Sequence, residues 1–234
     1  MSHDWELIAR TEPMWGVLST DRFLAKNLTP ETRQEFFDSG VAHAKKMLER
    51  AEALLGPIAK GTAIDFGCGV GRMTIPLSRS FREVIGIDAS PSMLRLTEEN
   101  CARQGVSNAR TIASADVSSL PPQSVDFINS LIVFQHIPEP EGQAIFRSLL
   151  STLRVGGAAS VHFVIANLST QDYRERYVHK VPLADGGTAE MQMNVYDFNA
   201  LAGLLHRAGV MSFCADFEQH GGHLGCILYF RRAG

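Results

Sequence analysis

The chain has 234 residues, 45% of them hydrophobic, and a formal net charge of −3. This length and composition suit one globular domain with an extension. The charge and the lack of a long basic run argue against a nucleic-acid surface, and no segment approaches the ~20 apolar residues of a membrane helix.

The first twenty residues and the cysteines indicate the cellular compartment of the protein. Charged residues are scattered through the first twenty positions, with no apolar core segment, so no signal peptide is expected. The four cysteines show no paired spacing. We therefore expect a cytoplasmic protein with free thiols, in contact with no membrane.

Residues 1–57 are predicted to form a helical extension. Thr29 can cap a helix whose first position is Pro30, and the helix should end at Gly56-Pro57. Its apolar stripe is predicted to pack on a sheet and consists of Val41, Ala44, Leu48, Ala51 and Leu55. The aromatic residues before it, Trp15 among them, belong either to the core or to a lid over a site.

A buried strand over residues 62–66 should run into a glycine loop and then a helix. The loop has a glycine at every second position: Gly67, Gly69 and Gly71. Such a loop at the carboxyl end of a strand makes a small-molecule cradle. The dinucleotide fingerprint fails because its third small position is Arg72. Asp65 is a poor neighbour for a pyrophosphate and a good one for a cation.

The second strand is predicted over 83–87 and ends in Asp88, 21 residues after Gly67. An acid at this distance can accept from both hydroxyls of a ribose. The alternative is a helix cap, although Ser90 and Pro91 already provide the start of a helix. Met93 near that start belongs either to a ligand site or to the core.

The next strands are predicted over 110–115, followed by Asp116 and Val117, and over 125–130, followed by an apolar turn that contains His136. A helix over 141–153 and a strand over 158–164 come next, and His162 inside that strand is interpreted as a core residue.

Residues 166–195 are irregular and contain Tyr173, Arg174 and Tyr177, so they form either a solvated helix or a substrate-recognition element. A helix from Asp197 and strands over 211–217 and 226–231 complete the chain. No metal is expected, because no standard zinc spacing relates the nearby candidates Cys214, His220, His223 and Cys226.

Four landmarks in order carry a family resemblance: the glycine loop, Asp88, Asp116 and the segment 126–138. Together they resemble the class I, Rossmann-like, S-adenosylmethionine (SAM)-dependent methyltransferases of the small-molecule type. The resemblance covers residues ~58–234 and departs from the family pattern at Val155, where a proline usually precedes two glycines. It implies an α/β fold with a doubly wound, seven-stranded, mostly parallel sheet in the order 3-2-1-4-5-7-6. The last strand would be antiparallel, residues 58–234 would form the SAM-binding domain, and residues 1–57 would form a helical cap.

The resemblance also assigns roles to residues. The methionine end of SAM would meet the glycine loop and its charged neighbours, and the backbone at the end of the fourth strand: Asp65, Gly67, Gly69, Gly71, Arg72, Ser130 and Leu131. The ribose and adenine would meet Asp88, Ala89, Met93, Asp116 and Val117. The methyl acceptor would be a small molecule near Trp15, Tyr173, Arg174 and Tyr177.

The implied reaction is an in-line transfer of the SAM methyl group to a small-molecule acceptor. His136 is the first candidate for a general base, or else it shapes the pocket. One alternative is a SAM-binding regulator or partner protein without catalysis. A second and less favoured alternative is a nicotinamide-dependent oxidoreductase. The acceptor and the oligomeric state are left open.

Overall fold

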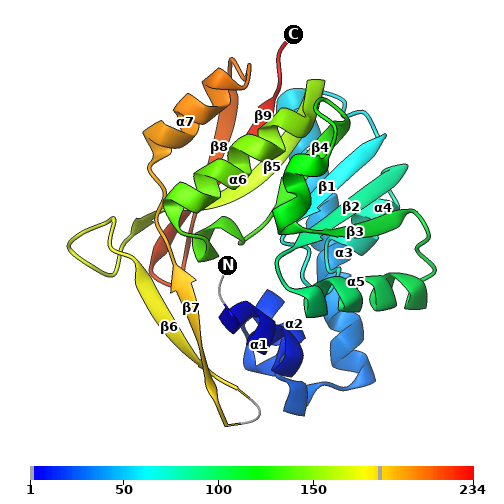
Figure 1. Cartoon of the computed structure of the whole chain (residues 1–234), viewed down its shortest axis with the longest axis vertical. Helices are drawn as coiled ribbons and strands as arrows, with labels where there is room; N and C mark the ends of the chain where they lie inside the picture. The colour runs from blue at the N-terminus through cyan, green and yellow to red at the C-terminus, as the bar shows by residue number, and fades with distance from the viewer. Residues whose placement is uncertain (1–2, 184–185) are drawn as a thin grey trace.

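The computed structural model describes residues 3–183 and 186–234. Its centre is a seven-stranded sheet in the order β3-β2-β1-β4-β5-β9-β8 (Figure 1). These strands are β3 (Ala109–Ala113), β2 (Glu83–Asp88), β1 (Thr62–Phe66), β4 (Val125–Ser130), β5 (Leu153–Asn167), β9 (His223–Arg231) and β8 (Phe213–His220). The first five are parallel, and β9 is antiparallel to both β5 and β8. The predicted fold class and strand order are confirmed, with β8 and β9 as the sixth and seventh strands of the sheet in chain order.

Helices cover both faces of this sheet. They are α3 (Pro30–Leu55) and α4 (Thr74–Ser78) on one face, and α6 (Glu139–Thr152) and α7 (Phe198–Arg207) on the other. Alternation along β1 explains the two layers, because successive side chains of a strand point to opposite faces. Ala63 packs in the cluster under α3, whereas its neighbour Ile64 packs in the cluster under α6. A further helix, α5 (Pro91–Arg103), packs beside β2 and β3.

The start of α3 is built as the sequence predicts. Thr29 Oγ1 accepts from the backbone N–H of Thr32, and Thr32 Oγ1 accepts from the backbone N–H of Thr29 at 2.7 Å. Most of the predicted stripe packs on the sheet, but Val41 does not. Its side chain is exposed, and Met47 is buried in the cluster under α3.

The N-terminal elements lie beside the carboxyl edge of the sheet (Figure 1). They are two short helices and two single turns: α1 (His3–Thr11), α2 (Pro13–Val17), η1 (Asp21–Phe23) and η2 (Ala25–Asn27). Ile8 of α1 is fully buried against Val181 and Met191.

Residues 166–195 contain a separate two-stranded antiparallel ribbon, β6 (Tyr177–Pro182) and β7 (Thr188–Met193). The solvated-helix alternative for this segment is therefore wrong. The ribbon projects from the sheet toward α1 (Figure 1). Two short 3-10 helices, η3 (Ser114–Ser119) and η4 (Phe134–His136), follow β3 and β4. In the described part of the chain, no helix combines the length and apolar character needed to cross a bilayer.

Candidate functional site

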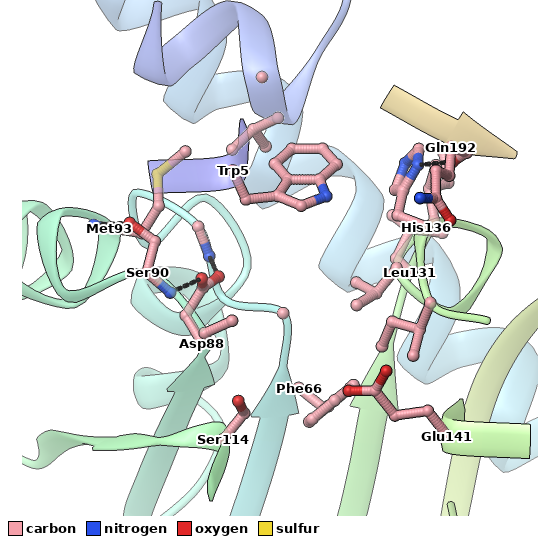
Figure 2. A pocket seen from close by; sticks show the side chains of 18 of the residues that line it. Trp5, Phe66, Asp88, Ser90, Met93, Ser114, Leu131, His136, Glu141 and Gln192 are labelled. Atoms are coloured by element: carbon pink, nitrogen blue, oxygen red, sulfur yellow. Dashed lines mark hydrogen bonds between the residues drawn. The ribbon is translucent and has the colours of Figure 1, made fainter. Parts of the chain in front are cut away.

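A cavity of about 420 Å³ opens at the carboxyl ends of β1, β2 and β4. This volume and this edge of a doubly wound sheet are typical of small-molecule sites. Figure 2 shows Asp88, Ser90 and Met93 on one side of the cavity and Leu131 and His136 on the other. We call these the Asp88 side and the His136 side.

The glycine loop after β1 forms the floor between the two sides. The backbone N–H groups of Gly67 and Cys68 both donate to the carbonyl of Ile87, at 2.7 and 3.0 Å, which ties the loop to the end of β2. Gly67 has a φ of 75°, and a Cβ there would lie 2.2 Å from the side chain of Val133. Only glycine therefore fits this position, where the backbone reaches the cavity wall.

Asp88 is half-buried at the end of β2 and faces the cavity. Its Oδ2 accepts from the N–H of Gly69 and its Oδ1 from the N–H of Ser90, both at 2.9 Å. Burial raises the pKa of this carboxyl above its usual value, against the lowering effect of these hydrogen bonds. Each carboxylate oxygen can accept more than one hydrogen bond, so Asp88 can hold the loop and also bind hydroxyl groups of a ligand.

The helix-cap alternative for Asp88 is not what the structure has. Ser90 is the N-cap of α5, and its Oγ accepts from the N–H of Met93 at 3.1 Å. Met93 is buried and also lines the cavity, so its position agrees with both alternatives, a core residue and a ligand contact.

Asp65 and Arg72 lie behind the glycine loop and line a second, smaller cavity with Gly67, Leu131 and Ile132. Asp65 is buried, and its two oxygens accept from Thr74 Oγ1 at 2.6 Å and Asn129 Nδ2 at 2.8 Å. Burial raises its pKa to about 6.

Arg72 is buried as well, and its Nε donates to Ser39 Oγ of α3 at 3.1 Å. Burial lowers the pKa of this guanidinium, and the charge of Asp65 opposes that effect. The small cavity thus holds one acidic and one basic group beside the loop.

The turn after β4 carries backbone strain. Ile132 has a φ of 57°, a conformation that β-branched residues rarely adopt. Such strain costs about 1–3 kcal/mol and clusters at functional sites. Leu131 and Ile132 line both cavities, whereas Ser130 is buried and lines neither.

His136 is half-buried on η4 and belongs to a network with the β6–β7 ribbon. Its Nδ1 donates to the carbonyl of Gln192 at 2.8 Å, because a carbonyl oxygen can only accept. Its Nε2 is then the acceptor for Gln135 Nε2 at 3.2 Å. Burial lowers the pKa of His136 to about 4, so the ring is neutral near pH 7.

Trp5 of α1 closes the cavity from above the two sides (Figure 2). Its ring centroid lies 4.8 Å from that of His136. The next residue, Glu6, fastens α1 to the start of α5 by accepting from Ser90 Oγ at 2.5 Å and Ser92 Oγ at 2.7 Å. Burial alone would raise the pKa of Glu6, but these hydrogen bonds outweigh it and lower the pKa to about 2.

Several residues predicted for the site lie elsewhere. Asp116 is exposed on η3, and Val117 is buried in the core beside it. Gly71 lines neither cavity, and its N–H closes a turn onto the carbonyl of Cys68. Ala89, in contrast, lines the main cavity as predicted.

The residues predicted to meet the acceptor also lie outside the lining of both cavities. Trp15 is buried in the cluster with Ile8. Tyr173 and Tyr177 are 62% and 50% exposed, and Arg174 donates to Asp197 at 2.9 Å.

Trp5, one of the aromatic residues predicted for the core or a lid, lines the main cavity, and so do residues that the sequence did not assign to the site, among them Ser114, Glu141 and Gln192. Trp5 gave a signal as an aromatic residue in a polar segment. Ser114 gave a weaker one, since it immediately follows β3. Nothing local marks Gln192, because it reaches the cavity only through the β6–β7 ribbon.

Comparison with known proteins adds independent findings. Residues 63–157 match the model of a methyltransferase domain. The chain is 30% identical over 112 residues to the ubiquinone biosynthesis O-methyltransferase of Cupriavidus pinatubonensis, covering 47% of this chain and 44% of that protein. It is 39% identical over 74 residues to the 23S rRNA (uracil(1939)-C(5))-methyltransferase of Aeromonas salmonicida, covering 32% of this chain and 17% of that protein. The chain therefore spans less than half the length of these curated relatives.

Among solved structures, magnesium protoporphyrin IX methyltransferase from Synechocystis with bound S-adenosylhomocysteine (SAH) has a TM-score of 0.58 and 17% identity. The alignment covers 88% of this chain and 89% of that one. At this identity the likeness concerns the fold alone.

Proposed function

Because this chain carries a class I, Rossmann-like, SAM-dependent methyltransferase domain, we propose that the whole protein transfers the methyl group of SAM to a small-molecule acceptor. The observation that carries the proposal is the cavity between the glycine loop and Asp88, at the carboxyl edge of β1 and β2. SAM supplies a methyl group already activated by its sulfonium. The protein's tasks are therefore to orient both reactants and to exclude water.

The chemistry of the lining fits this cofactor. We assign the ribose hydroxyls to Asp88, whose carboxylate faces the cavity, and the adenine to the wall formed by Ala89 and Met93. Ser114 lines this wall where β3 ends, so we add it to the adenine contacts. The assignment of Asp116 and Val117 to the adenine stays a prediction, and it requires the η3 turn to move.

We assign the methionine end of the cofactor to the second cavity. Arg72 would bind its carboxylate, and the acidic surroundings of Asp65 would favour its ammonium group. Gly67, Gly69 and Leu131 would provide the backbone between the two cavities, with Ser130 and Gly71 supporting the turns. A charged pair next to the loop suits a zwitterionic group better than a pyrophosphate, which argues against the nicotinamide alternative.

The His136 side would receive the acceptor. Trp5, Leu131, Ile137 and Pro138 make it largely apolar, and Glu141 points into it from α6 (Figure 2). A largely apolar and partly aromatic compartment supports a small, partly apolar acceptor. A ribosomal RNA substrate, as in one group of relatives, is less well supported, because the net charge is negative and Arg174 is already paired with Asp197 and Glu139.

The structure favours the pocket-shaping role of His136 over the role of a base. A pKa of about 4 makes a weak base near pH 7, and Nε2 already accepts from Gln135. The base role stays a prediction, for which Glu141 is a second candidate.

Two measurements test the proposal. Calorimetry with SAM, SAH and NADH should show binding of SAM and SAH only. A response to NADH alone would overturn it. A mass-spectrometric screen of small-molecule extracts, run beside unmethylated ribosomal RNA, should detect methyl transfer in the extract. Tight SAM binding with no transfer in either sample would favour the non-catalytic alternative.

A further inference from the structure

Strands β5, β9 and β8 bring three metal-ligating side chains together at the antiparallel end of the sheet. His162 comes from β5, and Glu218 and His220 come from β8. Glu218 and His220 are two residues apart on one strand, so they lie on the same face. The ligand atoms of the three side chains all lie within 4.8 Å of one another, and His162 Nε2 is 3.6 Å from Glu218 Oε1.

The two histidines of this group are unusual among the described residues. His162 is fully buried, and neither of its ring nitrogens has a hydrogen-bond partner there. Both buried ring nitrogens of His220 are likewise without a partner in this part of the chain. The large majority of buried side-chain polar atoms in proteins have a hydrogen-bond partner, so an imidazole with two unpartnered buried nitrogens is uncommon. The interpretation of His162 as an ordinary core histidine therefore does not account for its surroundings.

Strand β9 lies between β5 and β8, and it has no side chain at the point where His162 and His220 approach each other. Gly225 of β9 stands opposite Glu218 in the register. A Cβ at Gly225 would lie 2.5 Å from His162 Nε2 and 3.1 Å from His220 Cε1. The missing side chain therefore lets groups from β5 and β8 approach each other across β9.

We propose that His162, Glu218 and His220 bind one divalent transition-metal ion of the Zn²⁺ and Co²⁺ class. Two imidazoles and one carboxylate are a recognised ligand set for such ions. With metal–ligand bonds of about 2.0–2.2 Å, tetrahedral ligands lie about 3.4 Å apart, close to the separation of His162 Nε2 and Glu218 Oε1. Glu218 is 49% exposed and His220 is half-buried, so both can turn inward around the fixed His162.

This group differs from the Cys214, His220, His223 and Cys226 set weighed in the sequence. Cys226 is buried in the core cluster under α6 and α7, with Val161 and Phe163, the neighbours of His162 on β5. It therefore lies on the opposite face of the sheet from His162. The proposed ion would join β5 to β8 and is independent of the methyl-transfer proposal.

The test uses the full chain without a histidine tag. We expect Co²⁺ titration to give weak visible absorption bands of nitrogen and oxygen ligation at one ion per chain. We also expect Zn²⁺ to raise the melting temperature. The double variant Glu218→Gln/His220→Gln should bind more than about ten-fold more weakly and lose the thermal shift. His206→Gln, an exposed histidine on α7, is the matched control and should behave as the unaltered chain.

The melting temperature without metal and the circular dichroism spectrum check that the double variant folds. An intense thiolate charge-transfer band, or binding unchanged in the double variant, would overturn the proposal. So would the absence of binding together with an imidazolium signal from His162 in the nuclear magnetic resonance spectrum, which would indicate an ion pair with Glu218 instead.

Discussion

The two sides of the cavity are built in different ways. On the Asp88 side most groups come from one continuous segment, residues 66–93, with Ser114 added from the end of β3, and backbone hydrogen bonds join the loop to β2. On the His136 side the groups come from Trp5, His136 and Gln192, which are brought together by side-chain contacts.

This difference indicates what each side can do. Strand ends fixed by the sheet hold one geometry, which suits a methyl donor of the same structure in every turnover. We expect the helix fastened by Glu6 and the projecting ribbon to be able to move apart, which under the proposed function would let an acceptor enter and a product leave. Changes on the Asp88 side should therefore affect cofactor affinity, and changes on the His136 side should affect turnover.

The largest effect is expected for Asp88→Ala. The variant would lose the proposed hydrogen bonds to the ribose and the hydrogen bond that Asp88 accepts from Gly69, and we expect SAM to bind about 100-fold more weakly in calorimetry. Asp38→Ala on the exposed part of α3 is the control and should bind SAM normally. If Asp88→Ala binds SAM with unchanged affinity, the Asp88 side does not determine cofactor binding, and the proposed difference in role between the two sides is wrong.

Next in size is Gly67→Ala compared with Gly56→Ala. Both glycines have a φ near 75–79°, but only at Gly67 would the new Cβ meet another side chain, since nothing lies within 4 Å at Gly56. We expect Gly67→Ala to lower the free energy of unfolding by about 2 kcal/mol more than Gly56→Ala does. Chemical denaturation measures both, and equal losses would mean that Val133 gives way.

Trp5→Ala should affect turnover rather than cofactor binding. Loss of the ring over the cavity should lower kcat/KM for the acceptor about ten-fold by admitting water and loosening His136, a transition-state effect of about 1.4 kcal/mol. SAM affinity should change by less than about three-fold. Tyr173→Ala is the exposed aromatic control, and an equal loss there would restore Tyr173 to the acceptor site.

The smallest effect is expected for the detachment of α1 from the start of α5 at acidic pH. The pKa of Glu6 is lowered from 4.5 to about 2, so its stabilisation is complete above pH 4.5 and is lost as the pH falls toward 2. The pKa of His136 is lowered from 6.5 to about 4, so its neutral folded form also loses stability as the pH falls through that range.

Hydrogen exchange should therefore show protection of α1 declining below about pH 6.5, before that of β1. Glu6→Gln should weaken α1 by about 1 kcal/mol at pH 7 and remove the lower step. The same loss of protection in β1 would contradict independent movement of the two sides.

The sequence predicted the Asp88 side well, because its signals are local. Glycine spacing, the acid at the end of β2 and the helix start at Ser90 each depend on a few neighbouring residues. The residues proposed to contact the adenine were harder to predict, since Ser114 at the start of η3 lines the cavity whereas Asp116 on the same element is exposed.

The His136 side was predicted poorly for a physical reason. Gln192 reaches the cavity only because β6 pairs with β7 and because η4, which carries His136, follows β4. Tyr173, Arg174 and Tyr177 looked functional by composition, but they lie outside the cavity lining, and Arg174 is held by Asp197 and Glu139. Such long-range pairings leave no periodic trace in the sequence.

The packing of α1 has a consequence for the order in which the chain assembles. Ile8 and Trp15 precede Val181, Ala189 and Met191, against which they pack, by a long stretch of chain, so the ribosome makes them before their partners. The apolar side of α1 is therefore made before the residues that cover it, and its docking closes a long loop. The contact between α1 and the β6–β7 ribbon, and with it the His136 side of the cavity, is expected to form late in folding.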